Sequence, residues 1–470
     1  MIRDVMTMKN HAHIKEASEL EILSFSGGFF LQEFLSTVFG SWLFFFYETE
    51  MGLNSWLITL GYTIYALFNA FNSPILGYYT NRKNRFTERW GRHFPWIIFS
   101  AIPWFVCLFF VYSPNLLSNY NDIILLVWFT SFICLFSFFF TIFSVNYTSL
   151  FPKKFRSEEK RREAMSIIGA VSFIASGLGS IFPALIVQFN NLRSYSFMAF
   201  FSMFIGFLIF GLMIPGIRED KINKKYKYEI KENGTIRDFF HTFKFSLKHR
   251  NFVVLIILIF LNLIILRSVG AAFPYVVRYI FDAPTITIGI ISSFYIIGAV
   301  CSMPFWKRIG NKIDNNKLSL MLSGFLVIIT QIFLLFVPNV PFAYFMAFIY
   351  GWTISGFFIL LTIQINADVL DELAAITKER NENIYTGIRG FFVNFSIVAQ
   401  AFAFSIIHEA TGFVQGADKQ SILAQWGIRF TLALLPLVCT VLGILIFWKF
   451  YDLTKEKVKK NKKRLDELKI

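Results

Sequence analysis

Apolar runs about 20 residues long recur along almost the whole chain, and only short stretches with charged residues, glycine or proline interrupt them. The chain has 470 residues, of which 55% are hydrophobic and 16% charged, so it holds more apolar side chains than one soluble core could bury. In lipid the backbone of each run must be helical, because its polar groups find no water there. The sequence therefore predicts an all-α membrane protein.

Twelve transmembrane helices are predicted. The expected spans are 22–47, 56–79, 94–112, 123–147, 165–187, 195–215, 252–277, 286–306, 318–337, 342–367, 384–408 and 430–450. The longest loop divides them six and six. We expect an N-terminal six-helix bundle over 1–215, a cytoplasmic linker over 216–250, a C-terminal six-helix bundle over 251–454 and a basic cytoplasmic tail over 455–470.

The distribution of basic residues predicts the topology. A net charge of +15 would suggest nucleic acid as the partner of a soluble protein, but here lysine and arginine gather in the loops after the second, fourth and eighth spans. The loops after the first, third and ninth spans contain neither residue. By the positive-inside rule we expect a multi-pass protein of the cell membrane with both termini in the cytoplasm and no nucleic-acid partner.

The two predicted bundles have matching junctions. The second span ends near Pro74 and enters a basic turn, and the eighth span ends near Pro304 and enters another. Corresponding prolines and basic turns indicate parallel six-helix repeats, which is the major facilitator arrangement. In that arrangement a solute site is expected near the middle of the membrane, between the repeats.

Four motifs in order carry a resemblance to a known family. They are NSPILG at 72–77, RWGRHFPW at 89–96, YTSLFP at 147–152, and ADVLDE at 367–372 followed by Tyr385. This set resembles the glycoside-pentoside-hexuronide:cation symporter family, the melibiose permease-like branch of the major facilitators. The resemblance implies transport of a sugar or glycoside by alternating access; chance similarity within another major facilitator branch is the alternative.

The charged residues of that family are largely replaced here. The resemblance places two sodium-binding aspartates of the second helix at Asn69 and Ser73, an aspartate of the fourth helix at Ser144 and a lysine of the eleventh helix at Asn394. A hard cation in a medium of low dielectric requires anionic oxygen, which Asn69 and Ser73 lack. The sequence therefore predicts no sodium coupling at this site.

Glu33 falls where the resemblance places a sugar-binding aspartate. It belongs to a stripe of polar and small residues on the first span, which also includes Thr37, and similar stripes occur on the second and fourth spans. The stripes predict an aqueous cavity in which Glu33 binds solute or a proton; hydrogen bonding between helices is the alternative. The predicted substrate-binding residues are Glu33, Thr37, Asn69, Asn72, Ser73, Thr141, Ser144, Arg267 and Asn394.

Arg267 is the second charge deep in a predicted span. Charge at that depth requires a partner or water. Because the first and seventh helices face each other in this fold, we expect either an ion pair between Glu33 and Arg267 that solute or proton can open, or an arginine that extends toward the outer surface.

A cytoplasmic gate is predicted where acidic residues at the end of the tenth span meet basic loops. The residues expected to form it are Arg82, Arg89, Arg92, Asp368, Asp371, Glu372 and Arg389. Ion pairs among them would latch the inner side of the transporter. The alternative is that these exposed charges only set topology and solubility, since each exposed pair contributes about 0 to 1 kcal/mol.

Other functions remain as alternatives. A cavity with little charge also suits a lysolipid or another amphiphile, and a non-transporting membrane sensor or scaffold is a further class. No enzyme is predicted, because the sequence contains no phosphate loop, metal-ligand cluster or paired nucleophile, and His408 is read as a structural histidine. We expect no cofactor and no metal, a monomer in the lipid bilayer, and a small-molecule solute as partner, with a proton as the candidate coupling ion.

Overall fold

The computed structural model describes residues 18–80, 90–117, 120–155, 157–218, 243–379 and 382–468, and every regular element in these ranges is helical. Eleven helical segments of this described part are long and apolar enough to cross a membrane. A twelfth long helix, α4 (Ser55–Thr80), covers the predicted second span. The prediction of an all-α membrane protein is confirmed.

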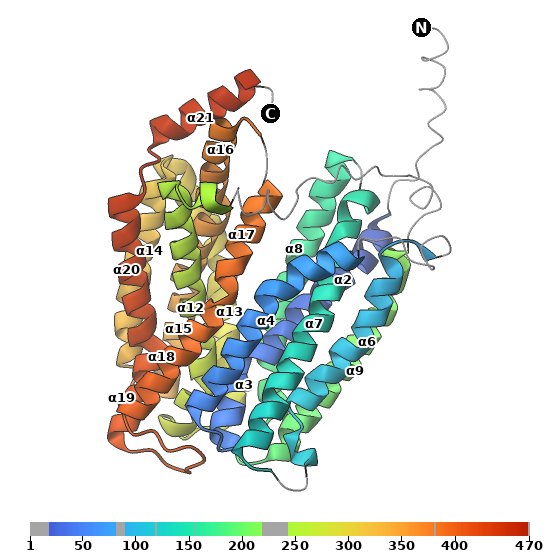
Figure 1. The fold of residues 1–470 in the computed structure, drawn as a ribbon. Coiled ribbons are helices and arrows are strands. Elements are labelled where there is room, and N and C mark those ends of the chain that lie inside the picture. The colour runs from blue at the N-terminus through green and yellow to red at the C-terminus, as the bar shows by residue number, and fades with distance from the viewer. Residues whose placement is uncertain are drawn as a thin grey trace.

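The helices form two groups that stand side by side (Figure 1). The first group contains α2 (Glu19–Ser41), α3 (Leu43–Phe45), the π-helical turn η1 (Phe46–Glu50), α4, α6 (Phe94–Val111), the short η2 (Pro114–Leu116), α7 (Asp122–Lys154), α8 (Glu158–Ile186) and α9 (Leu192–Ile217). Within it, α2 packs on α8 and α9, and α7 packs on α4 and α6.

The second group begins at residue 250. It contains α12 (Arg250–Tyr279), α13 (Ile286–Ile313), α14 (Asn316–Leu335), α15 (Val340–Ile359), η3 (Leu360–Ile365), α16 (Asn366–Thr377), α17 (Glu382–Asn394), α18 (Ser396–Ala410), α19 (Ile422–Arg429), η4 (Phe430–Leu434), α20 (Leu435–Phe450) and α21 (Lys455–Leu468). Contacts of α8 with α13 and of α4 with α18 join the two groups. We call the end with α16 and α21 proximal and the end with α3 and α19 distal (Figure 1).

Several helices continue beyond the spans that hydropathy marks. α7 reaches Lys154 and α13 reaches Ile313, each seven residues past the predicted end. Apolar side chains are needed only within the lipid, whereas backbone hydrogen bonding continues into polar sequence. Most of the predicted 216–250 linker, residues 219–242, lies outside the described part.

The predicted start of the last span, residue 430, is wrong by eight residues, because the helix begins at Ile422. The intervening turns contain Arg429, which lowers the hydropathy there. Its guanidinium donates hydrogen bonds to the carbonyl oxygens of Leu335, at 3.3 Å, and Val337, at 2.8 Å, where α14 ends. A charge that caps the carbonyls of a neighbouring helix is thus accommodated near the membrane edge.

Close helix contact in the second group depends on two glycines. A Cβ at Gly298 of α13 would overlap the carbonyl oxygen of Phe348, and a Cβ at Gly351 of α15 would overlap the carbonyl oxygen of Tyr295. Small residues of this kind let two membrane helices approach until their backbones touch. They fix α13 and α15 as one rigid pair.

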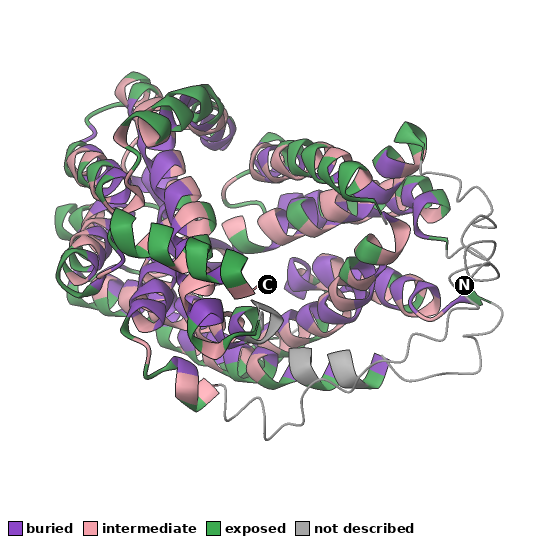
Figure 2. Cartoon of the chain, turned by 90° about the horizontal axis from the view of Figure 1, so that it is seen from above, coloured by how far each residue is buried: buried purple, intermediate pink, exposed green. Residues whose placement is uncertain are grey.

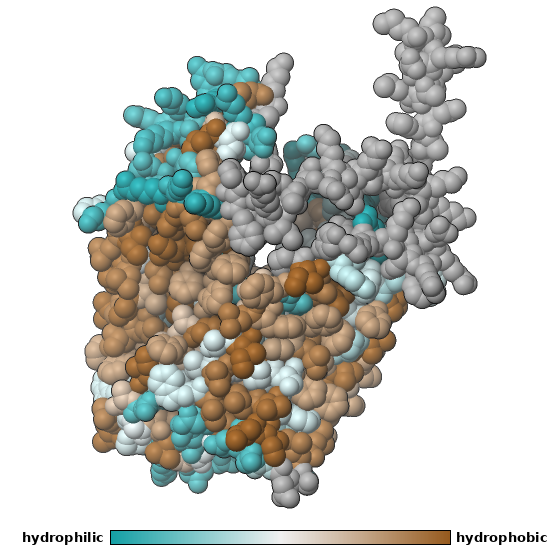
Figure 3. All heavy atoms as spheres, in the orientation of Figure 1, coloured by the Kyte–Doolittle hydropathy of each residue, from teal (hydrophilic) through white to brown (hydrophobic). Residues whose placement is uncertain are grey.

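The surface matches a membrane environment. Large apolar side chains are exposed around both groups, among them Phe71, Phe99, Phe197 and Leu212. On the face drawn in Figure 3, hydrophobic residues cover most of the middle of both groups, and hydrophilic residues gather at the proximal end of the second group and in patches toward the distal end. Seen from above, buried residues lie on the helix faces that meet neighbours, and exposed ones on the outer faces (Figure 2). The chain is a multi-pass membrane protein.

Candidate functional site

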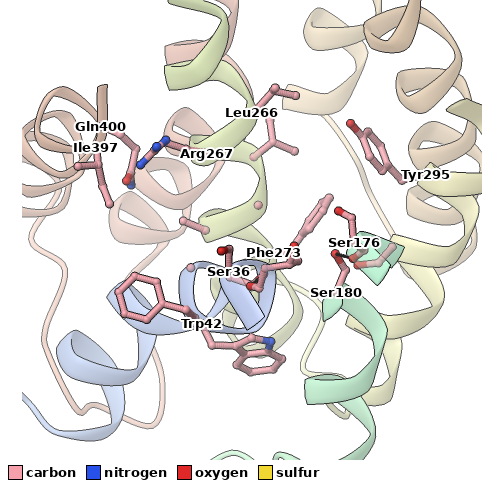
Figure 4. Close-up of a pocket in the computed structure, with 18 of the residues that line it drawn as sticks. Ser36, Trp42, Ser176, Ser180, Leu266, Arg267, Phe273, Tyr295, Ile397 and Gln400 are labelled. Atoms are coloured by element: carbon pink, nitrogen blue, oxygen red, sulfur yellow. Dashed lines mark hydrogen bonds between the residues drawn. The ribbon is translucent and has the colours of Figure 1, made fainter. Parts of the chain in front are cut away.

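A cavity of about 870 Å³ lies between the two helix groups. Its wall is built from α2, α4, α7 and α8 of the first group and from α12, α13, α15, α17 and α18 of the second. Serine, threonine, tyrosine and amide side chains share the wall with several phenylalanines (Figure 4). This volume lies within the range of about 300 to 1,000 Å³ that ligand pockets occupy.

The sequence left two roles open for the polar stripes of the first group: lining a cavity and forming hydrogen bonds between helices. The structure shows both roles. Thr37, Asn69 and Thr141 line the cavity. Asn69 also accepts a hydrogen bond from the hydroxyl of Ser137, which joins α4 to α7. Ser144 lies outside the lining and donates to Oε1 of Gln32 at 2.7 Å, which joins α7 to α2. Polar residues therefore bind helices together directly beside the cavity.

Glu33 lies one turn from Thr37 on the same face of α2, but it is not part of the cavity lining. Its side chain is exposed, and its backbone carbonyl accepts a hydrogen bond from the Thr37 hydroxyl at 2.7 Å. In this conformation Glu33 and Arg267 do not form the ion pair that the sequence suggested. Contact of Glu33 with a solute or proton stays a prediction.

The other predicted residues of the second span differ in position. Asn72 is buried and does not line the cavity, and its side-chain nitrogen has no hydrogen-bond partner among the described residues. The side chain of Ser73 lies outside the described part of the structure. Asn394 of α17, in contrast, lines the cavity.

Arg267 carries the only formal charge in the described cavity wall. It is on α12, and its side chain enters the cavity (Figure 4). The outward-extending alternative therefore does not describe this conformation. No Asp or Glu is among the lining residues, so the cavity has a net positive charge.

A first buried charge cluster joins the two helix groups at the distal end, and none of the residues predicted for the site belongs to it. Glu48 of η1 is 0% exposed and His408 of α18 is 1% exposed, and Nδ1 of His408 lies 2.9 Å from Oε1 of Glu48. The hydroxyl of Tyr275 on α12 donates to the other oxygen of Glu48. The π-helical turn directs this carboxylate from the first group into the second.

A second cluster lies two residues further along the same turn. Nη1 of Arg278 donates to Oε1 of Glu50 at 2.9 Å, and these side chains are 6% and 2% exposed. Glu50 also accepts from the hydroxyl of Tyr195 at 3.0 Å, while Nη2 of Arg278 donates to the side-chain oxygen of Asn190. Both acids of the FYETE segment thus bind bases of the other helix group, and two acids directly after an apolar run were the available signal.

Three of the residues predicted for the proximal gate have partners within the second group. Asp368 accepts from the side-chain nitrogen of Asn316 at 2.6 Å, and Glu372 accepts from that of Asn251 at 2.9 and 3.0 Å. Arg389 donates to the side-chain oxygen of Asn366 at 3.0 Å. Arg92 and Asp371 take part in further interactions, and Arg82 and Arg89 lie outside the described residues. The latch stays a prediction.

Within the described part, no three His, Cys, Asp or Glu side chains gather closely enough to hold a metal ion.

Solved transporter structures share this architecture. The D-xylose-proton symporter superposes with a TM-score of 0.63 at 13% identity, over 92% of this chain and 97% of that one. The nucleoside transporter NupG superposes with a TM-score of 0.62 at 12% identity, over 92% and 98% of the respective chains. Residues 24–455 match the MFS/sugar transport protein family, and the chain belongs to that family. It is therefore a secondary transporter of the major facilitator type.

Two relatives of this chain are named as symporters. The sodium-dependent lysophosphatidylcholine symporter 1 of Xenopus tropicalis is 22% identical over 446 residues, which are 85% of this chain and 80% of the relative. The uncharacterized symporter YnaJ of Bacillus subtilis (strain 168) is 24% identical over 471 residues, covering 97% and 96%. Membership of this family identifies a transporter rather than an enzyme.

Proposed function

We propose that this transporter carries a small polar solute, a sugar or glycoside, by alternating access. The cavity of about 870 Å³ between the helix groups carries the proposal, because it lies next to a distal end where buried contacts of Glu48 and Glu50 join the two groups. The two groups would rock around this cavity and expose it to each side of the membrane in turn. The family description, which includes sugar transport, supports this class of solute.

The composition of the wall supports a coupling ion other than sodium. Asn69 supplies only a dipole where a sodium site would need a carboxylate, so coupling to sodium at this helix is not part of the proposal. A proton is the proposed partner, with Glu33 as its acceptor next to the cavity-facing stripe. We propose a monomer with cytoplasmic termini and a proximal latch between the acids of α16 and the basic loops.

An amphiphile is the second candidate. Phe39, Phe140, Phe173, Phe273 and Phe358 line the cavity together with the polar residues, so an apolar chain would find contacts there. The relatives named as lysophosphatidylcholine symporters favour the same candidate.

The test is uptake into sealed vesicles that contain the purified protein. A radiolabelled sugar or glycoside should accumulate when a proton gradient is imposed, and replacement of sodium by potassium should leave the rate unchanged. Competition by lysolipids but not by sugars would favour the amphiphile. Binding without movement of any solute across the membrane would identify a sensor instead.

A further inference from the structure

Arg267 is the starting point, since its charge has no counter-charge in this structure. Among the described residues it forms no ion pair and no hydrogen bond, and no acid lines the cavity that it enters. A guanidinium within a membrane span is costly unless a partner or water meets its five donors.

Other arginines of the second helix group are bonded differently. Arg278 pairs with Glu50, Arg429 donates to backbone carbonyls of α14, and Arg389 donates to Asn366. The structure thus satisfies arginine donors where they serve packing. The unused donors of Arg267 point to a partner that is not part of the chain.

Gln400 of α18 supplies an independent observation. Its side chain is 4% exposed and lines the cavity, yet its nitrogen has no hydrogen-bond partner among the described residues. Figure 4 shows Arg267 directed toward Gln400. A buried amide without an acceptor loses free energy that a bound acceptor would restore. The guanidinium of Arg267 and the neighbouring amide of Gln400 can therefore both donate hydrogen bonds to the oxygen atoms of a bound solute.

We propose that the cavity takes a solute with one anionic oxygen group, a carboxylate or a phosphate, that accepts hydrogen bonds from Arg267 and Gln400; this assignment rests on the transport function proposed above. A guanidinium donates two parallel bonds to either group, which suits a planar carboxylate and a phosphate alike. Across the cavity, Ser36, Ser176 and Ser180 offer hydroxyls to the neutral part of the solute (Figure 4).

The experiment uses pairs of solutes in which one member carries an anionic group that the other lacks. Binding to the full-length protein in nanodiscs is measured for glucose against glucuronate, for glucose against glucose 6-phosphate, and for monoacylglycerol against lysophosphatidic acid. The anionic member of at least one pair should bind more than tenfold more tightly. The three arms separate a sugar carboxylate, a sugar phosphate and a lipid phosphate.

Variants connect that difference to the two side chains. Arg267→Gln should abolish the preference for the anion, and Arg267→Lys should retain part of it, because lysine keeps the charge but not the fork geometry. Gln400→Ala leaves the guanidinium intact and should weaken anion binding several-fold. Arg308→Gln removes the same charge at an exposed position on α13 and should change nothing.

The outcomes separate the two proposals. Tight binding or uptake of a neutral solute, with no gain for its anionic partner, overturns the anion site and leaves the transport function standing. A preference for the anion that survives in both Arg267→Gln and Gln400→Ala overturns it as well. If no solute of any pair binds or crosses the membrane, the proposed function itself fails, and the anion site fails with it.

Discussion

In the described part of the structure, buried charged residues have partners at the distal end of the molecule but not in the cavity. At the distal end, Glu48 binds His408 and Glu50 binds Arg278, so each acid of η1 meets a base of the other helix group. In the cavity, Arg267 has no such partner among the described residues. The acids at the distal end therefore contact bases within the chain, whereas Arg267 in the cavity is available to a partner from outside the chain.

This difference bears on the alternating access proposed above. To open the distal end, the protein must separate two buried pairs and expose them to water, which rehydrates them. A solute that pairs with Arg267 would add a favourable interaction in the cavity and contribute to that change. The four predictions below test whether paired and unpaired charges have these separate roles.

The largest effect is expected when one partner of the Glu50–Arg278 pair is removed. Glu50→Gln leaves the guanidinium of Arg278 buried without a counter-charge, which should lower the free energy of unfolding by about 3 kcal/mol. Chemical denaturation of the protein in detergent measures it. The double variant Glu50→Gln with Arg278→Gln should recover part of the loss. A loss below about 1 kcal/mol in the single variant would contradict a structural role for the pair.

A smaller effect is expected at the neighbouring cluster. Glu48→Gln keeps the shape of the side chain and an acceptor for Tyr275 but weakens the contact with His408, at a cost of about 1.5 to 3 kcal/mol. The distal end should then open more often. The measurement is labelling of Ser36→Cys, a cavity position, by an impermeant thiol reagent added to the distal side of vesicles.

The labelling rate should rise at least tenfold, which corresponds to about 1.4 kcal/mol. Glu158→Gln is a control at an exposed carboxylate of α8, because its ion pair with Arg162 lies within one helix and joins no other element. Equal labelling in the parent protein and in Glu48→Gln would show that the cluster does not hold the distal end closed.

An acid introduced into the cavity would give Arg267 a carboxylate partner, as the bases at the distal end already have. Asn69→Asp places a carboxylate in the wall that contains Arg267, so the guanidinium gains a competing counter-charge. The affinity for an anionic solute should fall about tenfold, or about 1.4 kcal/mol. Binding titrations in nanodiscs measure it, with Asn69→Ala as the uncharged control. An unchanged affinity in Asn69→Asp would speak against an electrostatic role of the cavity.

The smallest effect is expected at an exposed ion pair. Nη2 of Arg162 lies 3.3 Å from Oε2 of Glu158 on α8, and these side chains are 83% and 84% exposed. Glu158→Gln should change the free energy of unfolding by no more than about 0.5 kcal/mol, because water screens the pair. The same denaturation experiment measures it, and a loss as large as that of Glu50→Gln would remove the distinction between buried and exposed pairs.

Much of the fold could be predicted from the sequence, because lipid demands apolar helices of a given length. The spans, the polar stripes of α2, α4 and α7 and the depth of Arg267 all follow from local patterns. The helix ends were less predictable, as the early start of α19 shows, since Arg429 is accommodated by carbonyls of a distant helix.

The distal clusters could not be predicted in this way. Glu48 and His408 are 360 positions apart in the sequence, and Glu50 and Arg278 are 228 apart. Neither acid has a local partner, and the sequence gives no sign that the first span ends in a π-helical turn. His408 therefore resembled a structural histidine, although its ring contacts a carboxylate of the other helix group.

The sequence by itself determined the environment of the protein and its class, because the free energy of placing apolar helices in lipid is a property of composition and spacing. Only the tertiary structure decided which charges are paired. Helix packing brought Glu48 and Glu50 to bases of the other group, kept Glu33 out of the cavity wall and left Arg267 within it without a partner. Interaction between charges depends on distance, and distance across the bundle is set by packing.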